Sequence, residues 1–229
     1  PGTGIGGMQS GGLDLGIVHD GYRYGDKRRS LLGVPILTSA TKSLVTRWTA
    51  KVPPMLETQL SDHDGLAIGS IKNRTGITLQ NVRLLYDSWA YRLGDLKDGK
   101  LITVGEQLSP RKVKTIVTHD ALGEGGGTSS AAAGQVFSPE RASARELLNV
   151  MMFYDAAGGF GFAHLPNRFQ AYCDLSRMLE LGRAILVADA VRPAVKLVDD
   201  ATGNAVQDTP DGAAVVYRFV LPVKRRSGG

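Results

Sequence analysis

Residues 66–84 read LAIGSIKNRTGITLQNVRL, and this stretch decides the fold class. Leu66 to Lys72 is an extended, largely apolar run that predicts a β-strand. The next four residues, Asn73 to Gly76, predict a reversal of the chain, because asparagine and glycine tolerate a positive φ. A second extended run starts at Ile77. The stretch therefore predicts antiparallel β-structure.

The second run changes phase within itself. Ile77 and Leu79 share one face, whereas the next apolar pair, Val82 and Leu84, has the opposite parity. An extra residue in a strand sends every later side chain to the other face of the sheet. We therefore expect a β-bulge at Gln80-Asn81.

Short extended runs surround this stretch and alternate with turn residues, which is the rhythm of an antiparallel sandwich. Two turns are expected at Ser61–Gly65 and at Gly94–Lys100. In the run at residues 112–118, Val113 and Val117 would face inward. The predicted strands are 44–52, ended by two prolines, and then 55–60, 86–93, 101–104 and 112–118.

The segment from Ile71 to Leu84, followed by Tyr91 to Lys100, resembles immunoglobulin-like β-sandwich modules of bacterial envelope proteins. In both, an asparagine turn precedes a strand of the form leucine, x, asparagine, valine, and a leucine-glycine-aspartate-leucine turn ends in glycine. The resemblance covers roughly residues 65–105. It implies the C-terminal, extracytoplasmic region of a membrane-anchored bacterial protein, periplasmic or on the cell surface, and it supplies no catalytic residues.

The second half of the chain predicts helices and further strands. One helix is expected from Pro139 to Ala156, with Ser138 as its N-cap, and a second from after Asn167 to Gly182. Further strands are expected at 184–190, 195–198 and 215–223. The predicted fold is mainly β (α+β), an antiparallel immunoglobulin-like β-sandwich with a two-helix insertion.

Four regions are expected along the chain. The parts are a flexible N-terminal segment (1–43), the sandwich (44–120), a Gly/Ser/Ala-rich linker (121–137), and the helical pair with the C-terminal strands (138–229). Whether the last part shares the core of the sandwich is left open. Because the chain begins at Pro1 without a methionine, we expect it to be a piece of a longer protein.

Composition narrows the functional classes. The net charge is +5, but the basic residues are spread out apart from Lys27-Arg28-Arg29 and Lys224-Arg225-Arg226, which favours solvated surface over a nucleic-acid site. The single cysteine, Cys173, excludes an internal disulfide and a multi-thiolate metal site. No apolar run is long enough to span a bilayer.

No pattern of residues indicates catalysis, a cofactor or a metal. The sequence lacks a nucleophile elbow, its four histidines are isolated, and Asp62, His63 and Asp64 are adjacent residues that are typical of a turn. We therefore expect no catalytic, cofactor-binding or metal residues, and a structural or protein-interaction module rather than an enzyme. An enzyme whose site is assembled from distant residues is the less favoured alternative.

Four aromatic residues are candidates for contact with a partner. Phe160 and Phe162 lie in a glycine-rich segment, where they either anchor a partner or pack into the core. Trp48 and Trp89 could stack on a sugar. The expected partner is another envelope protein or another domain of the same polypeptide, reached through a sheet edge or the 159–162 segment. Cell-wall glycan is the alternative.

Overall fold

Residues 66–84 form antiparallel β-structure as predicted, but their two strands, Leu66–Asn73 and Leu79–Tyr86, belong to different sheets and do not pair with each other. The structure is a computed structural model. It describes residues 2–5, 23–24, 31–32, 44–47, 49–121, 137–140, 142–167, 171–190 and 215–225. The chain divides into two units, Pro1–Pro53 and Pro54–Gly229. In the first unit, β1 (Gly2–Ile5) pairs with β4 (Leu44–Arg47), and β2 (Arg23–Tyr24) pairs with β3 (Leu31–Leu32). The strand predicted from residue 44 thus ends at Arg47.

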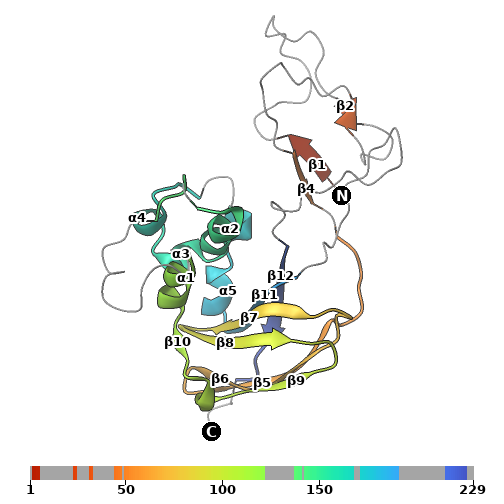
Figure 1. Ribbon diagram of the computed structural model, residues 1–229, viewed down its shortest axis with the longest axis vertical. Helices are drawn as coiled ribbons and strands as arrows, with labels where there is room; N and C mark the ends of the chain where they lie inside the picture. Colours follow the sequence, from red (N-terminus) through yellow and green to blue (C-terminus); the bar gives the residue numbers. More distant parts are fainter. Residues whose placement is uncertain are drawn as a thin grey trace, which may run out of the picture. The chain divides into compact units, whose positions relative to one another are not determined.

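The second unit is mainly β and contains two antiparallel sheets (Figure 1). The three-stranded sheet has the order β5-β6-β9, and the five-stranded sheet has the order β10-β8-β7-β11-β12. The strands of the first sheet are β5 (Leu56–His63), β6 (Leu66–Asn73) and β9 (Leu101–Val104). Those of the second are β7 (Leu79–Tyr86), β8 (Trp89–Leu96), β10 (Arg111–Lys112), β11 (Arg183–Asp189) and β12 (Val216–Pro222).

Two tight hairpins differ from the predicted positions of turns and strands. Ser61 to His63 belong to β5, and only Asp64 and Gly65 turn, with φ of 51° and 79°. This two-residue aspartate-glycine turn matches the twist of a hairpin. The run predicted as one strand from residue 86 to 93 is also interrupted, because Asp87, with φ of 50°, and Ser88 connect β7 to β8. Because β8 continues to Leu96, the predicted turn at 94–100 is limited to the residues after it.

The predicted β-bulge is confirmed. The pairing of β7 with β8 shifts register between Leu79 and Val82 and again before Arg83, and Asn81 has a φ of 49°. On the other side of β7, the pairing with β11 is irregular between Val187 and Asp189. The bulge therefore bends β7 at the same end of the sheet where β11 ends.

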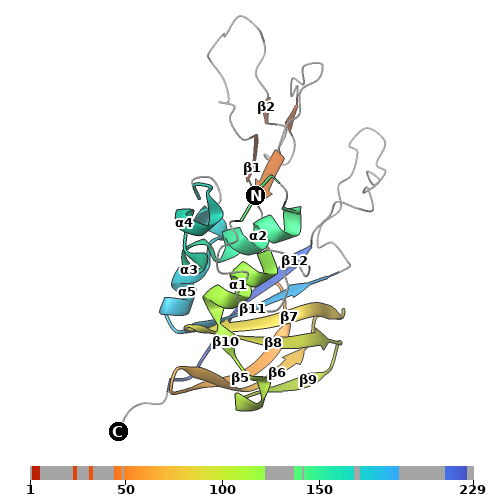
Figure 2. The ribbon, with the colours of Figure 1, turned by 60° about the vertical axis from the view of Figure 1, so that its left-hand side comes forward.

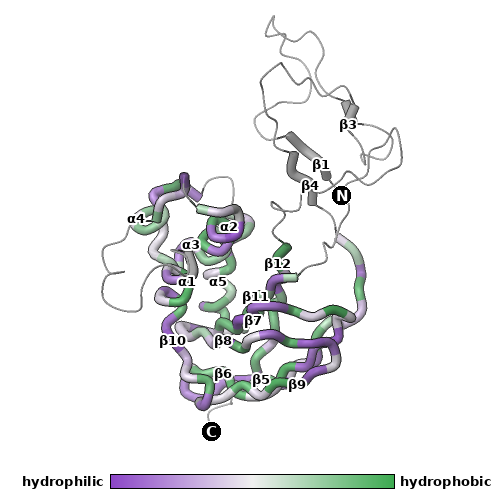
Figure 3. The backbone as a smooth tube through the Cα atoms, in the orientation of Figure 1, coloured by the Kyte–Doolittle hydropathy of each residue, from purple (hydrophilic) through white to green (hydrophobic). Residues whose placement is uncertain are grey.

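A hydrophobic core lies between the two sheets. Leu60, Ile71 and Val104 of the smaller sheet face Leu84 and Leu186 of the larger one, and all five are buried. Apolar and polar stretches alternate along the strands of both sheets (Figure 3), as expected where one face of a strand is buried. Both halves of the second unit contribute to this core, since Ala184, Leu186, Ala188 and Leu221 belong to it.

Asn73 closes the turn that carries the chain from one sheet to the other. Its side chain is fully buried and donates from Nδ2 to the carbonyl oxygens of Ile77 and Leu96, both at 2.8 Å. Its Oδ1 accepts from the N–H and the hydroxyl of Thr75, at 2.9 and 2.7 Å. All four hydrogen-bonding positions of the amide are therefore used.

Helices cover the other face of the five-stranded sheet (Figure 2). They pack against the side chains of Leu85, Ala90, Ile185 and Val187, which point away from the core between the sheets. The helical elements of this side are α1 (Val113–Ala121), α2 (Ala144–Met152), α3 (Tyr154–Ala157), α4 (Phe160–Ala163), η4 (Ala171–Cys173) and α5 (Ser176–Glu180). The short η2 (Glu106–Leu108) is separate from them, and its Leu108 packs against the core between the sheets.

The strand predicted at 112–118 is wrong, since only Arg111–Lys112 extend and α1 follows. Val113 and Val117 are buried as predicted, but Ile116 is buried with them. A strand would place Ile116 on the opposite face, whereas a helix places residues i, i+3 and i+4 together. Packing against the sheet therefore overrides the β-propensity of these branched residues.

The first predicted helix begins later than expected. Ser143, not Ser138, is the N-cap of α2, and it forms a capping box in which its Oγ accepts from the Glu146 N–H at 3.2 Å and Glu146 Oε2 accepts from the Ser143 N–H at 2.6 Å. The helix is interrupted at Phe153, and α3 ends at Ala157, with Gly158 as its C-cap, rather than at Ala156. The second predicted helix is divided into η4 and the shorter α5.

The strands predicted at 184–190 and 215–223 are confirmed as β11 and β12, and β11 lies between β7 and β12. The helices and both C-terminal strands are thus packed on the same sheet as β7 and β8. Most of the predicted linker, the strand at 195–198 and the Lys27–Arg29 cluster lie outside the described residues.

Candidate functional site

The strand β12 forms one edge of the five-stranded sheet. It pairs antiparallel with β11 over its whole length, from Arg183 opposite Pro222 to Asp189 opposite Val216. Among the residues that the structure describes, no strand pairs with the other side of Val216 to Val220. Figure 1 shows β12 beside β11. The strand at the opposite edge, β10, has only two residues.

Backbone geometry determines which groups of β12 are directed outward. The Ala190 N–H donates to the Val215 carbonyl oxygen at 3.1 Å, so these two residues form a hydrogen-bonded pair. In an antiparallel ladder such pairs recur at every second residue. Tyr217, Phe219 and Leu221 therefore bond to β11, and the N–H and C=O groups of the residues between them point away from it.

Two further observations support this assignment. Pro222 has the parity of the outward residues, and a proline has no N–H to offer to a neighbouring strand, so it is tolerated at an edge. Lys224 has the same parity, and its N–H donates to the Leu60 carbonyl at 2.9 Å while its own carbonyl accepts from the Asp62 N–H at 2.9 Å. The outer side of the C-terminal segment thus already receives one strand, β5, at Lys224.

The side chains of β12 alternate between the two faces of the sheet. Tyr217 and Phe219 lie on the face toward the core between the sheets, half-buried and stacked with ring centroids 6.1 Å apart. Val216 packs against the helical layer, and Val220, of the same parity, is 48% exposed. Arg218, also of this parity, is exposed, and its Nη1 donates to the Cys173 carbonyl at 3.1 Å.

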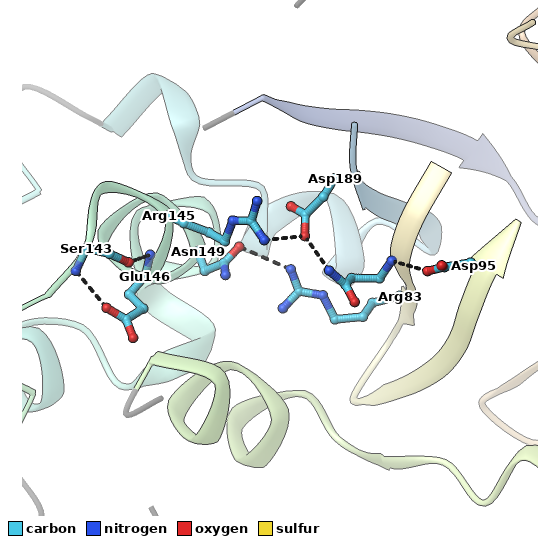
Figure 4. A network of polar contacts seen from close by, with 8 residues as sticks. Arg83, Asp95, Ser143, Arg145, Glu146, Asn149 and Asp189 are labelled. Carbon is cyan, nitrogen blue, oxygen red and sulfur yellow. Dashed lines mark hydrogen bonds and ion pairs between the residues drawn. The ribbon is translucent and has the colours of Figure 1, made fainter. Parts of the chain in front are cut away.

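A polar network fixes the end of β11 at Asp189, which lies opposite Val216 of β12 (Figure 4). The Asp189 side chain is only 7% exposed, and its Oδ2 accepts from Arg145 Nη1 of α2 at 3.0 Å and from Asn81 Nδ2 at 2.9 Å. Asn81 lies in the bulge of β7, and its N–H donates to Asp95 Oδ1 at 3.0 Å. The network thus joins the bulge, β8, β11 and α2.

A second contact in Figure 4 fixes α2 to β7. Arg83 Nη2 donates to Oδ1 of Asn149, a buried residue of α2, at 3.1 Å. Both polar contacts therefore hold α2 over the end of the sheet where β11 pairs with the start of β12. Buried polar groups with defined partners fix the relative position of the elements that carry them.

The structure places the predicted aromatic residues in different surroundings. Phe160 and Phe162 both belong to α4. Phe160 is 62% exposed and lies 6.2 Å from the His164 ring, whereas Phe162 is half-buried and stacks on Phe137 with centroids 5.8 Å apart. The segment thus combines both alternatives, with one ring in the core and one at the surface.

Trp89 is the first residue of β8. It is half-buried against the core between the sheets, and the Lys112 Nζ lies 3.9 Å from the centroid of its ring. A ligand that stacks on this ring would compete with the ammonium group, which binds the ring face by a cation–π interaction. Trp48 lies outside the described residues.

The titratable groups of the described residues form no recognisable reaction centre. No group of three or more His, Cys, Asp or Glu side chains within these ranges could hold a metal ion. His63 lies 3.5 Å from Asp64, and both are strongly exposed at a hairpin turn. Burial raises the pKa of the Tyr86 phenol, with Asp62 adding to this effect and Arg225 opposing it. Likewise, none of the described helices has the length and apolarity needed to cross a bilayer.

Sequence reasoning missed the edge position of β12. The alternation of residues 215–223 predicts the strand and its apolar face, and Pro222 is a signal of an edge. Strand order, however, depends on long-range pairing that neither signal contains. The Asp189 network was also missed, because its members are separated by up to 108 residues along the chain.

Comparisons with known proteins give one family match, which covers part of the chain. Residues 55–160 match the model of a domain of unknown function, DUF8725. The match begins just before β5 and ends at the first residue of α4, so it leaves out β11 and β12. Neither a curated protein nor a solved structure gives a significant match.

Proposed function

We propose that this chain is a non-catalytic protein-interaction module that binds an extended segment of a partner protein along the outer edge of β12. The observation that carries this proposal is the row of backbone groups at Val216, Arg218 and Val220 that point away from β11. An added strand supplies their hydrogen-bond partners, which is the basis of recognition by β-strand addition.

The surroundings of the edge support this function. Long exposed edges usually carry charges, prolines or very short strands that prevent pairing with other chains. The opposite edge follows this pattern, because β10 consists only of Arg111 and Lys112. In β12 the proline stands at the last position, and Val216 to Val220 include four apolar residues. The edge at β10 is thus too short and too charged to receive a strand, whereas the edge at β12 is long and mostly apolar, so strand addition would be selective for β12.

The Asp189 network supports the proposal in a second way. Binding of an extended segment costs less when the receiving strand is already ordered. Asp189 pairs with Val216 and is held by Arg145 and Asn81, so the start of the edge is fixed from the helical layer. The other end is fixed by Lys224, which bonds to β5. The edge is therefore supported at both ends.

The setting of the module is part of the same proposal. The resemblance of residues 65–105 to immunoglobulin-like modules of bacterial envelope proteins supports an immunoglobulin-like sandwich in the extracytoplasmic part of a membrane-anchored protein. A glycan-binding role has less support, because Lys112 occupies a face of Trp89. Phe160 remains a second candidate contact for a protein partner, since its ring is exposed.

The test is a selection of peptides with a matched set of variants. A displayed library of linear peptides is selected on the wild-type chain, and the peptides obtained are measured on Val220→Pro, Val220→Ala and Phe160→Ser. Val220→Pro removes one outward N–H, whereas Val220→Ala keeps it and shortens the side chain. We expect binding to be lost in Val220→Pro and largely kept in the other two.

Other patterns contradict the proposal. If Val220→Pro binds the selected peptides as well as wild type, the β12 edge is not the binding site. If Phe160→Ser alone loses them, the surface of α4 binds the partner. Far-UV circular dichroism of each variant shows that the fold is intact before binding is compared.

A further inference from the structure

The electrostatics of the β12 edge limit which segment can bind, provided that the edge is the binding site as proposed above. No acidic residue occurs in β12, and its only charged residue is Arg218 at its centre. Further basic side chains follow at the end of the edge, where Arg183 lies opposite Pro222 and Lys224 continues the strand, and both are exposed. The edge is therefore basic.

The acidic groups beside the two ends of the edge already have partners. Asp189 lies opposite Val216, but it is buried and bonded to Arg145 at 3.0 Å. Asp62, beside Lys224, accepts from the Gly65 N–H at 2.9 Å and also interacts with Tyr86. Neither carboxylate therefore neutralises Arg218.

Arg218 is able to bind a carboxylate of an added strand. Its guanidinium group has five N–H donors, and one nitrogen, Nη1, is engaged by the Cys173 carbonyl. The side chain is exposed, and the contact with Cys173 holds it on the helical side of the sheet. A residue directly opposite on an added strand would have its Cβ about 5 Å from that of Arg218, so the two side chains would meet.

The neighbours of Arg218 define the residues on both sides of that position. Two residues away along β12, on the same face, are Val216 and Val220, which favour β-branched partners. One residue away, on the opposite face, are Tyr217 and Phe219, which favour aromatic or β-branched partners. The preferred segment thus has two apolar residues, one acidic residue and two further apolar residues.

We infer that β12 selects an extended protein segment with a central Asp or Glu flanked on each side by two β-branched or aromatic residues. The pattern is the same in both directions, so it holds for parallel and for antiparallel addition. The basic composition of the whole chain, with a net charge of +5, favours the approach of an acidic segment.

The inference is tested with three peptides that share identical soluble flanks and differ at one residue. Their central sequences are Val-Ile-Glu-Ile-Val, Val-Ile-Gln-Ile-Val and Val-Ile-Lys-Ile-Val, and their dissociation constants are measured by fluorescence anisotropy. We expect the glutamate peptide to bind about tenfold more tightly than the lysine peptide, with glutamine between them, because an attractive cross-strand pair becomes repulsive. The preference should weaken as salt is raised.

Substitutions of Arg218 test whether this residue causes the preference for the glutamate peptide. Arg218→Glu should reverse the order of the glutamate and lysine peptides, and Arg218→Gln, which removes the charge but keeps a donor, should abolish it. Since both variants alter the contact with the Cys173 carbonyl, their thermal unfolding is recorded, and Arg218→Gln serves where Arg218→Glu fails to fold.

The outcomes separate this inference from the proposed function. If Val220→Pro abolishes binding of all three peptides but wild type binds them equally, the edge is the site and the charge preference is wrong. If Val220→Pro changes none of them, the edge is not the site. If no peptide binds and the wild-type chain dimerises in a way that Val220→Pro prevents, the segment received is β12 of a second copy and the inference is overturned.

Discussion

Two proline substitutions at adjacent residues of β12 should differ sharply in their effect on stability. The Phe219 N–H is directed toward β11, whereas the Val220 N–H is directed outward. Phe219→Pro therefore removes a bond of the ladder, and Val220→Pro does not. The pair tests the orientation of the edge without any partner.

The magnitudes follow from the surroundings of the two residues. Loss of one backbone hydrogen bond costs about 1 kcal/mol. Phe219 is also half-buried against the core between the sheets, and truncation of a fully buried phenylalanine costs about 3–5 kcal/mol, so we expect about 2 kcal/mol for a ring in this position. Phe219→Pro should thus lower the free energy of unfolding by about 3 kcal/mol. Val220→Pro should lower the free energy of unfolding by about 1 kcal/mol or less, because Val220 is 48% exposed and its N–H makes no bond to β11.

The assay is guanidinium chloride unfolding followed by far-UV circular dichroism, with thermal unfolding as a second measurement. For a domain of this size, a difference of about 2 kcal/mol corresponds to a difference in Tm of roughly 4–8 °C between the two variants. Equal destabilisation by the two prolines, or a larger effect of Val220→Pro, would refute the assigned parity and with it the proposed binding edge.

Three further predictions test other parts of the structure by the same unfolding measurement. Asp189→Asn should lower the free energy of unfolding by about 1–2 kcal/mol, a value discounted because the guanidinium of its partner Arg145 is 49% exposed. Glu57→Gln, in the surface ion pair with Arg74, should lower it by less than about 0.5 kcal/mol. Equal effects of the two substitutions would contradict the network. Gly69→Ala should cost more than about 3 kcal/mol, since the added Cβ would clash with the backbone carbonyl oxygen of Gln59. Gly76→Ala should cost only about 1 kcal/mol, since its Cβ meets empty space and only the φ of +75° is unfavourable, and equal costs would contradict this close approach. Burial raises the pKa of the Tyr91 phenol in the folded state. The contribution of this group to stability is therefore complete below a pH of about 10, the ordinary pKa of tyrosine, and is lost as the pH rises through the pKa of the folded state. Tyr91→Phe should thus reduce the loss of stability above a pH of about 10, and an unchanged pH profile would contradict this.

Helix positions show how far the sequence alone could lead. Residues 113–117 contain branched residues that favour a strand, and the alternation of Val113 and Val117 with lysines fits a strand as well as a helix. Ile116 decides between the two only when the sheet face beneath it is known. By contrast, the capping box of Ser143 and Glu146 is a local signal that the sequence does contain, and it defines the start of α2 better than the Ser138–Pro139 pair.

The candidate site was less accessible to sequence reasoning than the fold. Phe160 and Phe162 are two residues apart in the chain and have similar local composition, yet one is exposed and the other stacks on Phe137. The edge of β12 depends on which strand lies beside which, and β11 and β7 pair across about a hundred residues. Such pairings are determined by the packing of the whole core and leave no local pattern.

The sequence by itself determined the β-rich character, the turn at Asn73 to Gly76, the bulge at Gln80-Asn81 and the alternation of β12, because each depends on side-chain periodicity or on the backbone preferences of a few neighbouring residues. Only the tertiary structure decided that α1 is a helix, that β11 lies between β7 and β12, and that β12 is an edge with a basic centre. These features depend on which faces remain to be buried once all strands have paired, and that requirement belongs to the folded chain as a whole.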